Sequence, residues 1–291
     1  LVENLRSNCL EIILVNDGSE DDSHDVCISA FDKYKEIVKY ICLSRNFGEH
    51  NAVLSGLNYS TGEYAVIIDD DFQNPPEEIQ KLIDVSVSGR FDVVYSYYDK
   101  KYHSWSRNLG SEFNNMVATY LLNKPKDLYL SSFKCLNRFL IDEIIKYKGP
   151  YPYMDGLILR TTRNIGKVLV RHNKRKDGKT GYTMRKLIGL WLNMFVNFSV
   201  YPLRLSMFLG FMFSLIGGIF AVTIITEKLL RPQIPVGITL IIVSILVFSG
   251  VQLIMLGIMG EYIGKQFLTS NQTPQYVVRR IISLEALSAE E

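Results

Sequence analysis

The sequence has few cysteines, almost no net charge and two long stretches without any charged residue. Its cysteines have neither the paired spacing of a disulfide framework nor the spacing of a metal site, so we expect buried, reduced thiols at Cys9, Cys27, Cys42 and Cys135. The formal net charge of +2 argues against nucleic acid as the main partner. No internal repeat, low-complexity segment or signal-peptide pattern is apparent.

Charge is absent between Arg204 and Glu227 and again between Arg231 and Glu261. Each stretch supplies the roughly 20 apolar residues that a helix needs to cross a bilayer. The sequence therefore predicts two transmembrane helices, at residues 206–226 and 235–260. Their connection is too short to be a domain, so everything outside this hairpin must lie on one side of the membrane. Basic residues are more frequent outside the hairpin than in its connection, which favours a multi-pass protein of the cytoplasmic membrane with its catalytic part facing the cytoplasm.

Short β-rich runs alternate with helical patterns before the hairpin. The β-rich runs occupy residues 11–15, 38–43, 64–68 and 91–98, and the helical patterns lie near 23–34, near 49–59, from 75 onward and near 104–122. This alternation predicts an α/β domain over residues 1–182, with a mostly parallel sheet and helices on both faces.

Two further segments complete the predicted organisation. Residues 183–205 combine a basic start with an aromatic, apolar body, which favours a helix at the membrane interface; a buried helix packed on the sheet is the alternative. Residues 261–291 are predicted to form a polar cytoplasmic tail.

Three adjacent carboxylates, Asp69 to Asp71, end an apolar run and repel one another unless a cation lies among them. In an extended segment Asp69, Asp71 and Gln73 project to one side. Oxygen donors of this kind suit Mg²⁺ or Mn²⁺, which also takes oxygens from a nucleotide diphosphate. The alternative is purely structural: Asn74 caps a helix that begins at Pro75. Helix capping does not require the carboxylates upstream, so the sequence favours the metal site.

A second acidic stretch, Asn16-Asp17-Gly18-Ser19, follows the first β-rich run. By itself it predicts a turn, or a capping box formed by Ser19 and Asp22. In α/β sheets, however, ligands bind at the carboxyl ends of the strands, and both acidic stretches lie at such ends. The second stretch is therefore a candidate partner for the base or ribose of a nucleotide.

Six segments, taken in order, resemble glycosyltransferase family 2, and specifically the polyprenyl-phosphate glycosyltransferases related to dolichyl-phosphate mannose synthase. They are EIILVNDGSEDDS, LSRNFGEHNAVLSGL, YAVIIDDDFQNPPEEI, the basic GKTGY loop, RKLIGLWLNMFVNFSVYPLRL, and a two-span tail that ends in GIMGEYIGKQ. The resemblance covers nearly the whole chain. It implies a GT-A fold that moves a sugar from a nucleotide-sugar donor to a polyprenyl phosphate, undecaprenyl or dolichyl phosphate, with inversion.

The resemblance also implies roles for particular residues. Asp17 is expected to contact the nucleoside, Asp69 and Asp70 to bind the donor, and Asp71 with Gln73 and Asp69 to hold the Mg²⁺ or Mn²⁺, Asp71 being a catalytic residue. UDP is the expected nucleotide. The acceptor phosphate needs converging cations at the membrane edge, for which the candidates are Arg171, Arg175, Lys179 and Arg185. A solvated basic loop, or one that contacts lipid headgroups, is the alternative for each of these four.

The chain departs from the family at two places. Where some relatives have an aspartate before a Phe-Arg or Phe-Lys pair, this chain has Ser131 and Ser132 before Phe133 and Lys134. Asp155 then remains as the candidate catalytic base or acceptor-orienting group, with a helix N-cap or turn as its alternative. The family also begins with a strand that lines the nucleotide pocket, and we expect this strand to be absent from residues 1–182.

Two other functions compete with this one. A processive polysaccharide synthase has a Gln-x-x-Arg-Trp motif, which neither Trp105 nor Trp191 fits. A non-catalytic, membrane-anchored scaffold is favoured by the missing strand but not by the intact acidic cluster. A homo-oligomer formed through the hairpin is also plausible, because small residues let helices approach closely; the glycines concerned are Gly210, Gly217, Gly218, Gly257, Gly260 and Gly264. Packing of the two helices within one hairpin is the alternative for these glycines.

Overall fold

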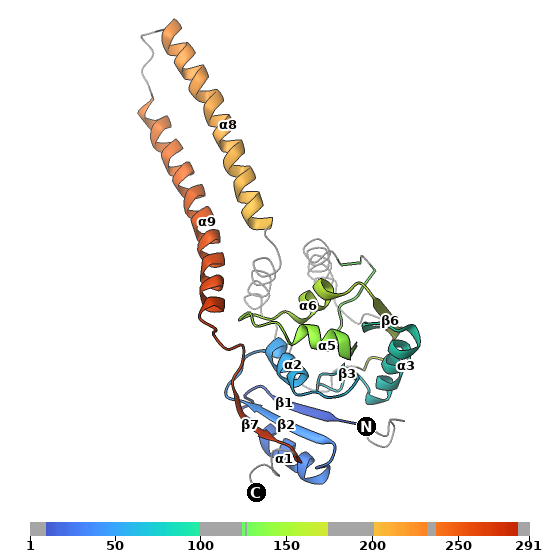
Figure 1. Ribbon diagram of the computed structural model, residues 1–291. Coiled ribbons are helices and arrows are strands. Elements are labelled where there is room, and N and C mark those ends of the chain that lie inside the picture. The colour runs from blue at the N-terminus through green and yellow to red at the C-terminus, as the bar shows by residue number, and fades with distance from the viewer. Residues whose placement is uncertain (1–9, 99–123, 126, 174–200, 232–236, 285–291) are drawn as a thin grey trace. The chain divides into compact units, whose positions relative to one another are not determined.

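The computed structural model describes residues 10–98, 124–125, 127–173, 201–231 and 237–284 (Figure 1). The chain divides into two compact units. The sheet unit comprises Leu1–Leu187 and Gln272–Glu291, and the hairpin unit comprises Ile188–Asn271. The predicted helix near 104–122 and most of the predicted interfacial segment 183–205 lie outside the described residues.

One sheet of the sheet unit has the strand order β1-β2-β7. Its strands are β1 (Ile12–Asn16), β2 (Val38–Leu43) and β7 (Val278–Ile282). The first two are parallel, joined by helix α1 (Ser23–Lys33), whereas β7 is antiparallel to β2. Figure 1 shows this C-terminal strand, in red, beside the blue strands of the N-terminal region. A small core of Phe31, Val38, Tyr40 and Ile282 lies between α1 and this sheet.

The other sheet has the strand order β3-β5-β4-β6. Its strands are β3 (Tyr64–Ile67), β4 (Val93–Tyr97), β5 (Lys134–Asn137) and β6 (Ile165–Leu169). Helix α3 (Ile79–Gly89) follows a short 3-10 helix η1 (Pro76–Glu78) and packs on this sheet, where Leu82 meets Phe133 and Cys135. Burial raises the pKa of the Cys135 thiol to about 12, as expected for a reduced structural cysteine.

The remaining helices of the sheet unit are α2 (Glu49–Asn58), α5 (Arg138–Ile144) and α6 (Met154–Thr161). Helix α2 lies against β1 at Gly56, where an added Cβ would be 3.3 Å from the Val15 Cγ2 atom. The expected strand 38–43 and the helices near 23–34 and 49–59 are therefore found where the sequence predicted them.

The prediction of a mostly parallel sheet is wrong. Among the described strands, only β1–β2 and β4–β6 pair in parallel, whereas β2–β7, β3–β5 and β4–β5 are antiparallel. The reason is that β5 inserts between β3 and β4 in the opposite direction, and that β7 arrives from the far end of the chain. Within the described ranges, β1 and β3 each pair on one side only. The expected absence of the family's first strand stays a prediction.

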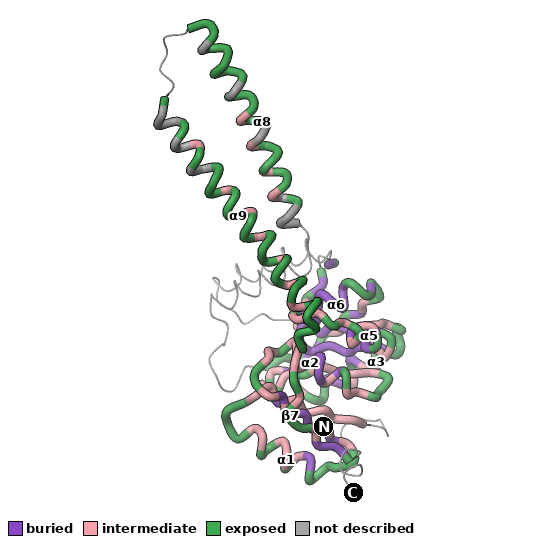
Figure 2. Tube along the Cα trace, turned by 60° about the vertical axis from the view of Figure 1, so that its left-hand side comes forward, coloured by how far each residue is buried: buried purple, intermediate pink, exposed green. Residues whose placement is uncertain are grey.

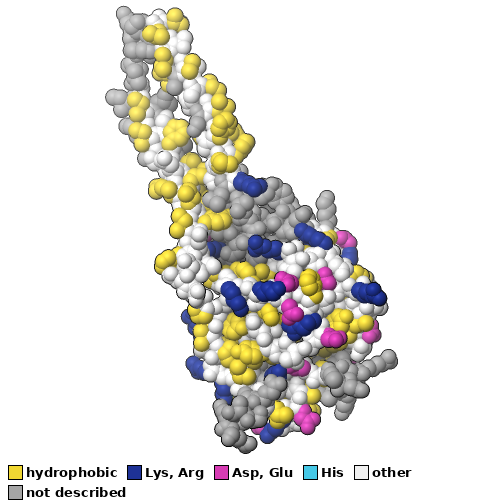
Figure 3. All heavy atoms as spheres, in the orientation of Figure 1, with side chains coloured by type: hydrophobic (Ala, Val, Ile, Leu, Met, Phe, Trp, Pro, Cys, Tyr) yellow, Lys and Arg dark blue, Asp and Glu magenta, His cyan; other side chains and the backbone are white. Residues whose placement is uncertain are grey.

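The hairpin unit consists of α8 (Tyr201–Leu230) and α9 (Ile238–Ser270), with the rings of Phe213 and Phe248 in edge contact at 6.4 Å. In the part of the chain that the structure describes, one helical segment, Ser206–Glu227, has the length and composition to cross a membrane. Exposed residues run along both helices (Figure 2), and apolar side chains are frequent on them (Figure 3), including Met207, Phe211 and Leu253. The second predicted span lies mostly within α9, and the two-span hairpin stays a proposal.

Candidate active site

The acidic turn, defined here as residues 68–75, joins β3 to η1. Its backbone is not extended, contrary to the sequence expectation. The Asp71 Oδ1 atom accepts a hydrogen bond from the Gln73 backbone N–H at 3.1 Å, and the residue between them, Phe72, has a left-handed φ of 59°. Asp71 and Gln73 therefore belong to one tight turn, rather than to alternate positions of a strand. Phe72 is 71% exposed, so the turn opens to solvent.

The alternative, in which Asn74 caps a helix that begins at Pro75, places the helix start one residue too early. Pro75 is the N-cap of η1 and Pro76 is its first residue. Asn74 is buried and does not cap the helix; its Oδ1 atom accepts a hydrogen bond from the Tyr98 hydroxyl at 2.9 Å. Asn74 thus anchors the end of the turn to the strand region after β4, and capping does not involve the carboxylates.

Ser131 and Ser132 precede β5, and Ser132 contacts the acidic turn. The Ser132 hydroxyl donates to Asp69 Oδ2 at 2.6 Å. Ser131 is buried, and its Oγ atom accepts hydrogen bonds from the Ser96 hydroxyl at 2.8 Å and from the Phe133 N–H at 3.2 Å. Ser132 therefore provides a hydroxyl that orients the first carboxylate of the acidic turn.

A buried ion pair joins β5 to α6. Lys134 and Asp155 are 4% and 8% exposed, and the Lys134 ammonium donates to Asp155 Oδ1, which also accepts from the Tyr95 hydroxyl at 2.9 Å. Burial raises the pKa of Tyr95 well above its usual range, and the Asp155 charge adds to this effect. Asp155 is the second residue of α6, whose N-cap is Tyr153, so the N-cap alternative for Asp155 is wrong.

Helix α2 contributes two titratable side chains to this region. Burial raises the pKa of Glu49, and the charge of Asp69 raises it further. Burial lowers the pKa of His50, where Lys134 acts in the same direction and Asp155 opposes it. The His50 ring is in edge contact with Tyr153 at 5.1 Å. The start of α2 therefore lies within electrostatic reach of both the acidic turn and the buried ion pair.

The segment after β6, Arg171 to Asn173, contacts the acidic turn at Gln73. The Asn173 N–H donates to the Gln73 carbonyl at 2.8 Å, and the Gln73 Nε2 and His172 Nε2 atoms are 3.4 Å apart. The His172 and Tyr98 rings are in tilted contact, with their centroids 4.1 Å apart.

Arg171, predicted to bind the acceptor phosphate, is 71% exposed at its side chain and pairs with the buried carboxylate of Glu78 at 2.7 Å. Burial alone would raise the pKa of Glu78, but hydrogen bonds from Lys81 and Arg171 outweigh it and hold this pKa below 4.5. Arg175, Lys179 and Arg185 lie outside the described residues.

The side chains of the turn after β1 accept hydrogen bonds from backbone N–H groups of the turn itself and of the Phe47–Gly48 loop. Asp17 accepts hydrogen bonds from the Phe47 N–H at 2.7 Å and from the Gly48 N–H at 2.8 Å, one on each carboxylate oxygen. Asn16 Oδ1 accepts from the Ser19 N–H at 2.8 Å, and α1 has Asp22 as its N-cap without a side-chain hydrogen bond. The turn is therefore built around Asn16, and no capping box forms. Asp17 holds the loop that leads into α2.

The oxygen donors of the acidic turn fit a hard divalent cation that needs few protein ligands. Among the described residues, no three His, Cys, Asp or Glu side chains are arranged to bind a metal on their own. Magnesium, however, commonly takes one or two carboxylates and completes its shell with water and phosphate oxygens. Asp69, Asp71 and the Gln73 amide supply such a partial set, and Asp70 is exposed beside them.

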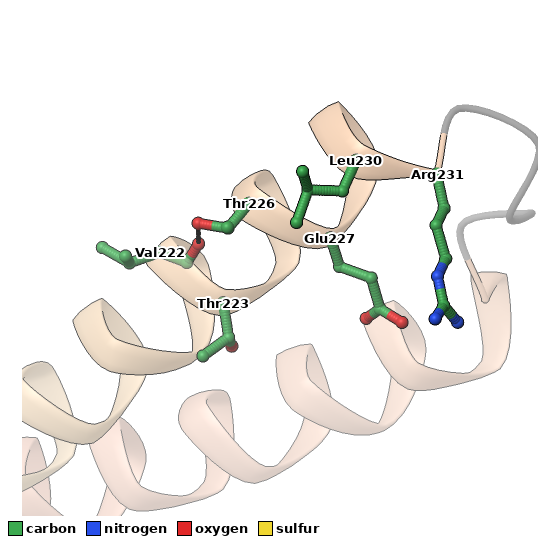
Figure 4. A pocket seen from close by; sticks show the side chains of 6 residues that line it. All are labelled: Val222, Thr223, Thr226, Glu227, Leu230 and Arg231. Carbon is green, nitrogen blue, oxygen red and sulfur yellow. Dashed lines mark hydrogen bonds between the residues drawn. The ribbon is translucent and has the colours of Figure 1, made fainter.

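An open hollow of about 440 Å³ lies on α8 (Figure 4), lined by Val222, Thr223, Thr226, Glu227, Leu230 and Arg231. The hydroxyls of Thr223 and Thr226 both donate to carbonyls of their own helix at 2.8 Å. Its lining residues belong to the last turns of α8 and to Arg231, which follows this helix, and none of the polar groups described above is among them. The candidate site is therefore the acidic turn with its surroundings.

Sequence reasoning missed Lys134, Glu49, His50 and His172. For Lys134 a signal was present, because a lysine at the start of an apolar strand predicts a buried partner. The other three lie near the site only because segments that are distant in sequence come together in the fold, so the sequence held no signal for them.

The glycosyl transferase family 2 model matches residues 1–145. The chain is 30% identical to the undecaprenyl-phosphate 4-deoxy-4-formamido-L-arabinose transferase of Sodalis glossinidius (strain morsitans), over 97% of this chain and 86% of that protein. It is 31% identical to the protein of the same name from Serratia proteamaculans (strain 568), over 94% of this chain and 84% of that one.

Among solved structures, glucosyl-3-phosphoglycerate synthase from Mycobacterium tuberculosis in complex with phosphoglyceric acid is 18% identical, with a TM-score of 0.48, over 67% of this chain and 72% of that chain. The family model and the two curated relatives establish the family. The chain belongs to glycosyltransferase family 2, among its polyprenyl-phosphate sugar transferases.

Proposed function

We propose that this protein is an inverting glycosyltransferase that moves a sugar from a nucleotide-sugar donor, with UDP as its nucleotide, to a polyprenyl phosphate at the cytoplasmic face of the membrane. The observation that carries the proposal is the acidic turn, with Asp71 and Gln73 in one open turn that is fastened on both sides. The similarity of the chain to undecaprenyl-phosphate sugar transferases over nearly its whole length supports the choice of acceptor.

The donor side of the site is assigned to the acidic turn. Asp71, Gln73 and Asp69 would hold a Mg²⁺ or Mn²⁺ ion, which would neutralise the negative charge that develops on the departing nucleoside diphosphate. Ser132 keeps the Asp69 carboxylate in place. Asp70 is proposed to contact the donor from its exposed position, and Asp17 to act near the nucleoside by holding the loop that ends at Gly48.

The acceptor needs little activation. A phosphate monoester has a second pKa near 6 and is largely dianionic at neutral pH. One of its oxygens forms a bond to the anomeric carbon as the bond from this carbon to the diphosphate oxygen breaks, and the electron pair leaves with the nucleoside diphosphate. No proton has to be removed from the attacking oxygen, so a strong protein base is unnecessary.

Asp155 is therefore proposed as an orienting group rather than a base. Its Oδ1 atom already accepts from Tyr95 and Lys134, so its position is fixed by two donors. Lys134 supplies the positive charge nearest to this carboxylate. Arg171, Arg175, Lys179 and Arg185 are proposed to hold the acceptor phosphate. Arg171 pairs with Glu78 of η1, the short helix that follows the acidic turn.

Membrane attachment is proposed to occur through α8 and α9 as a two-span hairpin. At about 1.5 Å per residue, the 30 residues of α8 and the 33 of α9 exceed the thickness of a bilayer core of about 30 Å. An added Cβ at any of the six hairpin glycines named above would have no described atom within 4 Å. They remain the proposed surface for a homo-oligomer.

The test is the transfer of radiolabelled sugar from a panel of nucleotide sugars to undecaprenyl phosphate, in membranes that contain this chain, with Mn²⁺ or with EDTA. We expect label in the organic-extractable lipid with one donor, and loss of that label in EDTA. Label that enters the lipid equally well in EDTA would contradict the metal assignment. The absence of label with every donor would contradict the proposed function.

A further inference from the structure

The chain returns to the sheet unit after the hairpin. We call residues 272–283 the C-terminal strap. Its strand β7 pairs with β2, with Ile282 opposite Tyr40 and Arg280 opposite Cys42. Ile282 is 8% exposed in the α1 core, and Ser283 is buried. The strap is thus an integral part of the fold that contains the candidate site, although some 200 residues separate it from the acidic turn.

Before β7, the strap contacts the turn that leads to α6. The side-chain amide of Gln275, which is half-buried, donates to the Tyr147 carbonyl at 2.9 Å and to the Gly149 carbonyl at 2.7 Å. Both bonds come from one NH₂ group, so its two hydrogens join two carbonyls of the same turn. A side chain without two hydrogens on one nitrogen cannot make this pair of bonds at this place.

The strap also contacts the loop that follows β2. The Val277 carbonyl accepts from the Ser44 N–H at 2.8 Å, and the Arg279 guanidinium donates to the Ser44 carbonyl at 3.2 Å. Ser44 begins the loop whose Phe47 and Gly48 amides hold Asp17. The bonds at Ser44 therefore lie on the nucleotide side of the site, and the bonds of Gln275 lie on the side of Asp155.

We propose that Gln275 is a positioning residue for the acceptor side of the active site. By joining the Tyr147 and Gly149 carbonyls, Gln275 fixes the connection between α5 and α6 five residues before α6 begins at Met154, and so holds Asp155 against Lys134 and Tyr95. The effect on the acceptor rests on the proposed function, whereas the effect on α6 does not.

The test compares Gln275→Glu with Gln272→Ala in the full chain, solubilised in detergent. Glutamate has nearly the shape of glutamine, but its carboxylate cannot donate to two carbonyls. Gln272 is an exposed glutamine of the same strap, and its replacement is the matched control. The measurements are hydrogen exchange of residues 145–160, the KM for undecaprenyl phosphate, and the affinity for UDP with Mn²⁺.

For Gln275→Glu we expect faster exchange at the turn and at α6, a KM for undecaprenyl phosphate raised about tenfold, and an affinity for UDP within about twofold of wild type. Gln272→Ala is expected to behave as wild type. Wild-type exchange and KM in Gln275→Glu would overturn the proposal. So would faster exchange throughout the sheet unit with an equal loss of UDP affinity, because that is the result of a general loss of stability.

Failure of the proposed function has a different signature. The wild-type chain would then transfer no sugar to undecaprenyl phosphate from any donor, yet the exchange of residues 145–160 would still differ between the two variants if Gln275 holds the turn. Equal exchange in both variants would overturn the role of Gln275, whatever the reaction.

Discussion

Two acidic turns of this molecule look alike in sequence and differ in structure. The turn after β1 contains Asp17, and both of its carboxylate oxygens accept backbone N–H groups of the Phe47–Gly48 loop. The turn after β3 contains Asp71, which accepts one N–H of its own turn, beside the exposed Phe72. A carboxylate between two distant backbone amides stabilises the fold, whereas carboxylates in an open turn still repel one another and favour a cation.

The comparison teaches that position at the carboxyl end of a strand does not decide function. Both turns follow strands of the sheet unit, and both contain aspartate. The difference is whether both carboxylate oxygens already accept hydrogen bonds from backbone N–H groups, as in Asp17, or only one does, as in Asp71. The variants below test whether the first turn is structural and the second catalytic, from the largest expected effect to the smallest.

Asp71→Asn is expected to have the largest effect. Loss of the negative ligand should lower the transfer rate by about 100-fold or more, with little change in thermal unfolding, because the turn is half-exposed. Initial rates with Mn²⁺ and thermal unfolding in detergent measure the two quantities. Glu77→Gln, an exposed carboxylate in η1, is the matched control and should retain its rate. Near-normal turnover in Asp71→Asn would refute the metal assignment.

Gly18→Ala, in the turn after β1, is expected to lower the stability of the fold, whereas Asp71→Asn is expected to lower the transfer rate. Gly18 has a φ of 71°, and an added Cβ would be 2.5 Å from the Arg45 carbonyl carbon, so backbone must move. We expect a loss of stability of about 1–3 kcal/mol, with a lower midpoint of thermal unfolding. Gly62→Ala, whose Cβ would be 3.3 Å from the nearest atom, is the milder control. An unchanged midpoint in Gly18→Ala would mean that this turn is not the rigid element described here.

Glu78→Gln tests the support of the open turn through pH. The pKa of Glu78 is held below its usual 4.5, so the ionised form stabilises the folded state. This stability is fully present above pH 4.5 and is lost as the pH falls through the lower folded value. The wild type should lose stability on acidification more steeply than Glu78→Gln, by about 1 kcal/mol after allowance for the exposed Arg171 and Lys81. Parallel curves of unfolding midpoint against pH would argue against it.

Ser132→Ala should have the smallest effect. It removes the hydroxyl that orients Asp69, but no charge and no metal ligand. We expect a rate loss below about tenfold, measured with saturating Mn²⁺. A loss as large as that of Asp71→Asn would place a catalytic group at this position after all.

Much of the fold was predictable from local pattern. The strand at Val38–Leu43 and the helices beginning at Ser23 and Glu49 lie where periodicity placed them, because each depends on residues close in sequence. The strand directions were not predictable, because β5 and β7 join their sheets through pairings between distant segments. The strand β7 was missed altogether, within a segment predicted to be a polar tail.

The candidate site, like the fold, was predictable where it depends on neighbouring residues and unpredictable where it depends on contacts between distant segments. The acidic turn was predicted from three adjacent aspartates, since their repulsion is a property of the sequence itself. Its left-handed Phe72 and its hydrogen bonds to Ser132 and Asn173 were not, because these bonds come from the segments just before β5 and just after β6, which are distant from the turn in sequence. Arg171 was predicted to bind phosphate, and its bond to Glu78 appears only in three dimensions.

The most direct test of the central claim is the Mn²⁺-dependent affinity for UDP of the wild type, Asp71→Asn and Asp17→Asn, measured by titration calorimetry of the full chain in detergent. We predict that Mn²⁺ strengthens the binding of UDP to the wild type and to folded Asp17→Asn, and has no effect on binding by Asp71→Asn. If Asp71→Asn keeps the full strengthening by Mn²⁺, the acidic turn does not hold the metal and the account is contradicted.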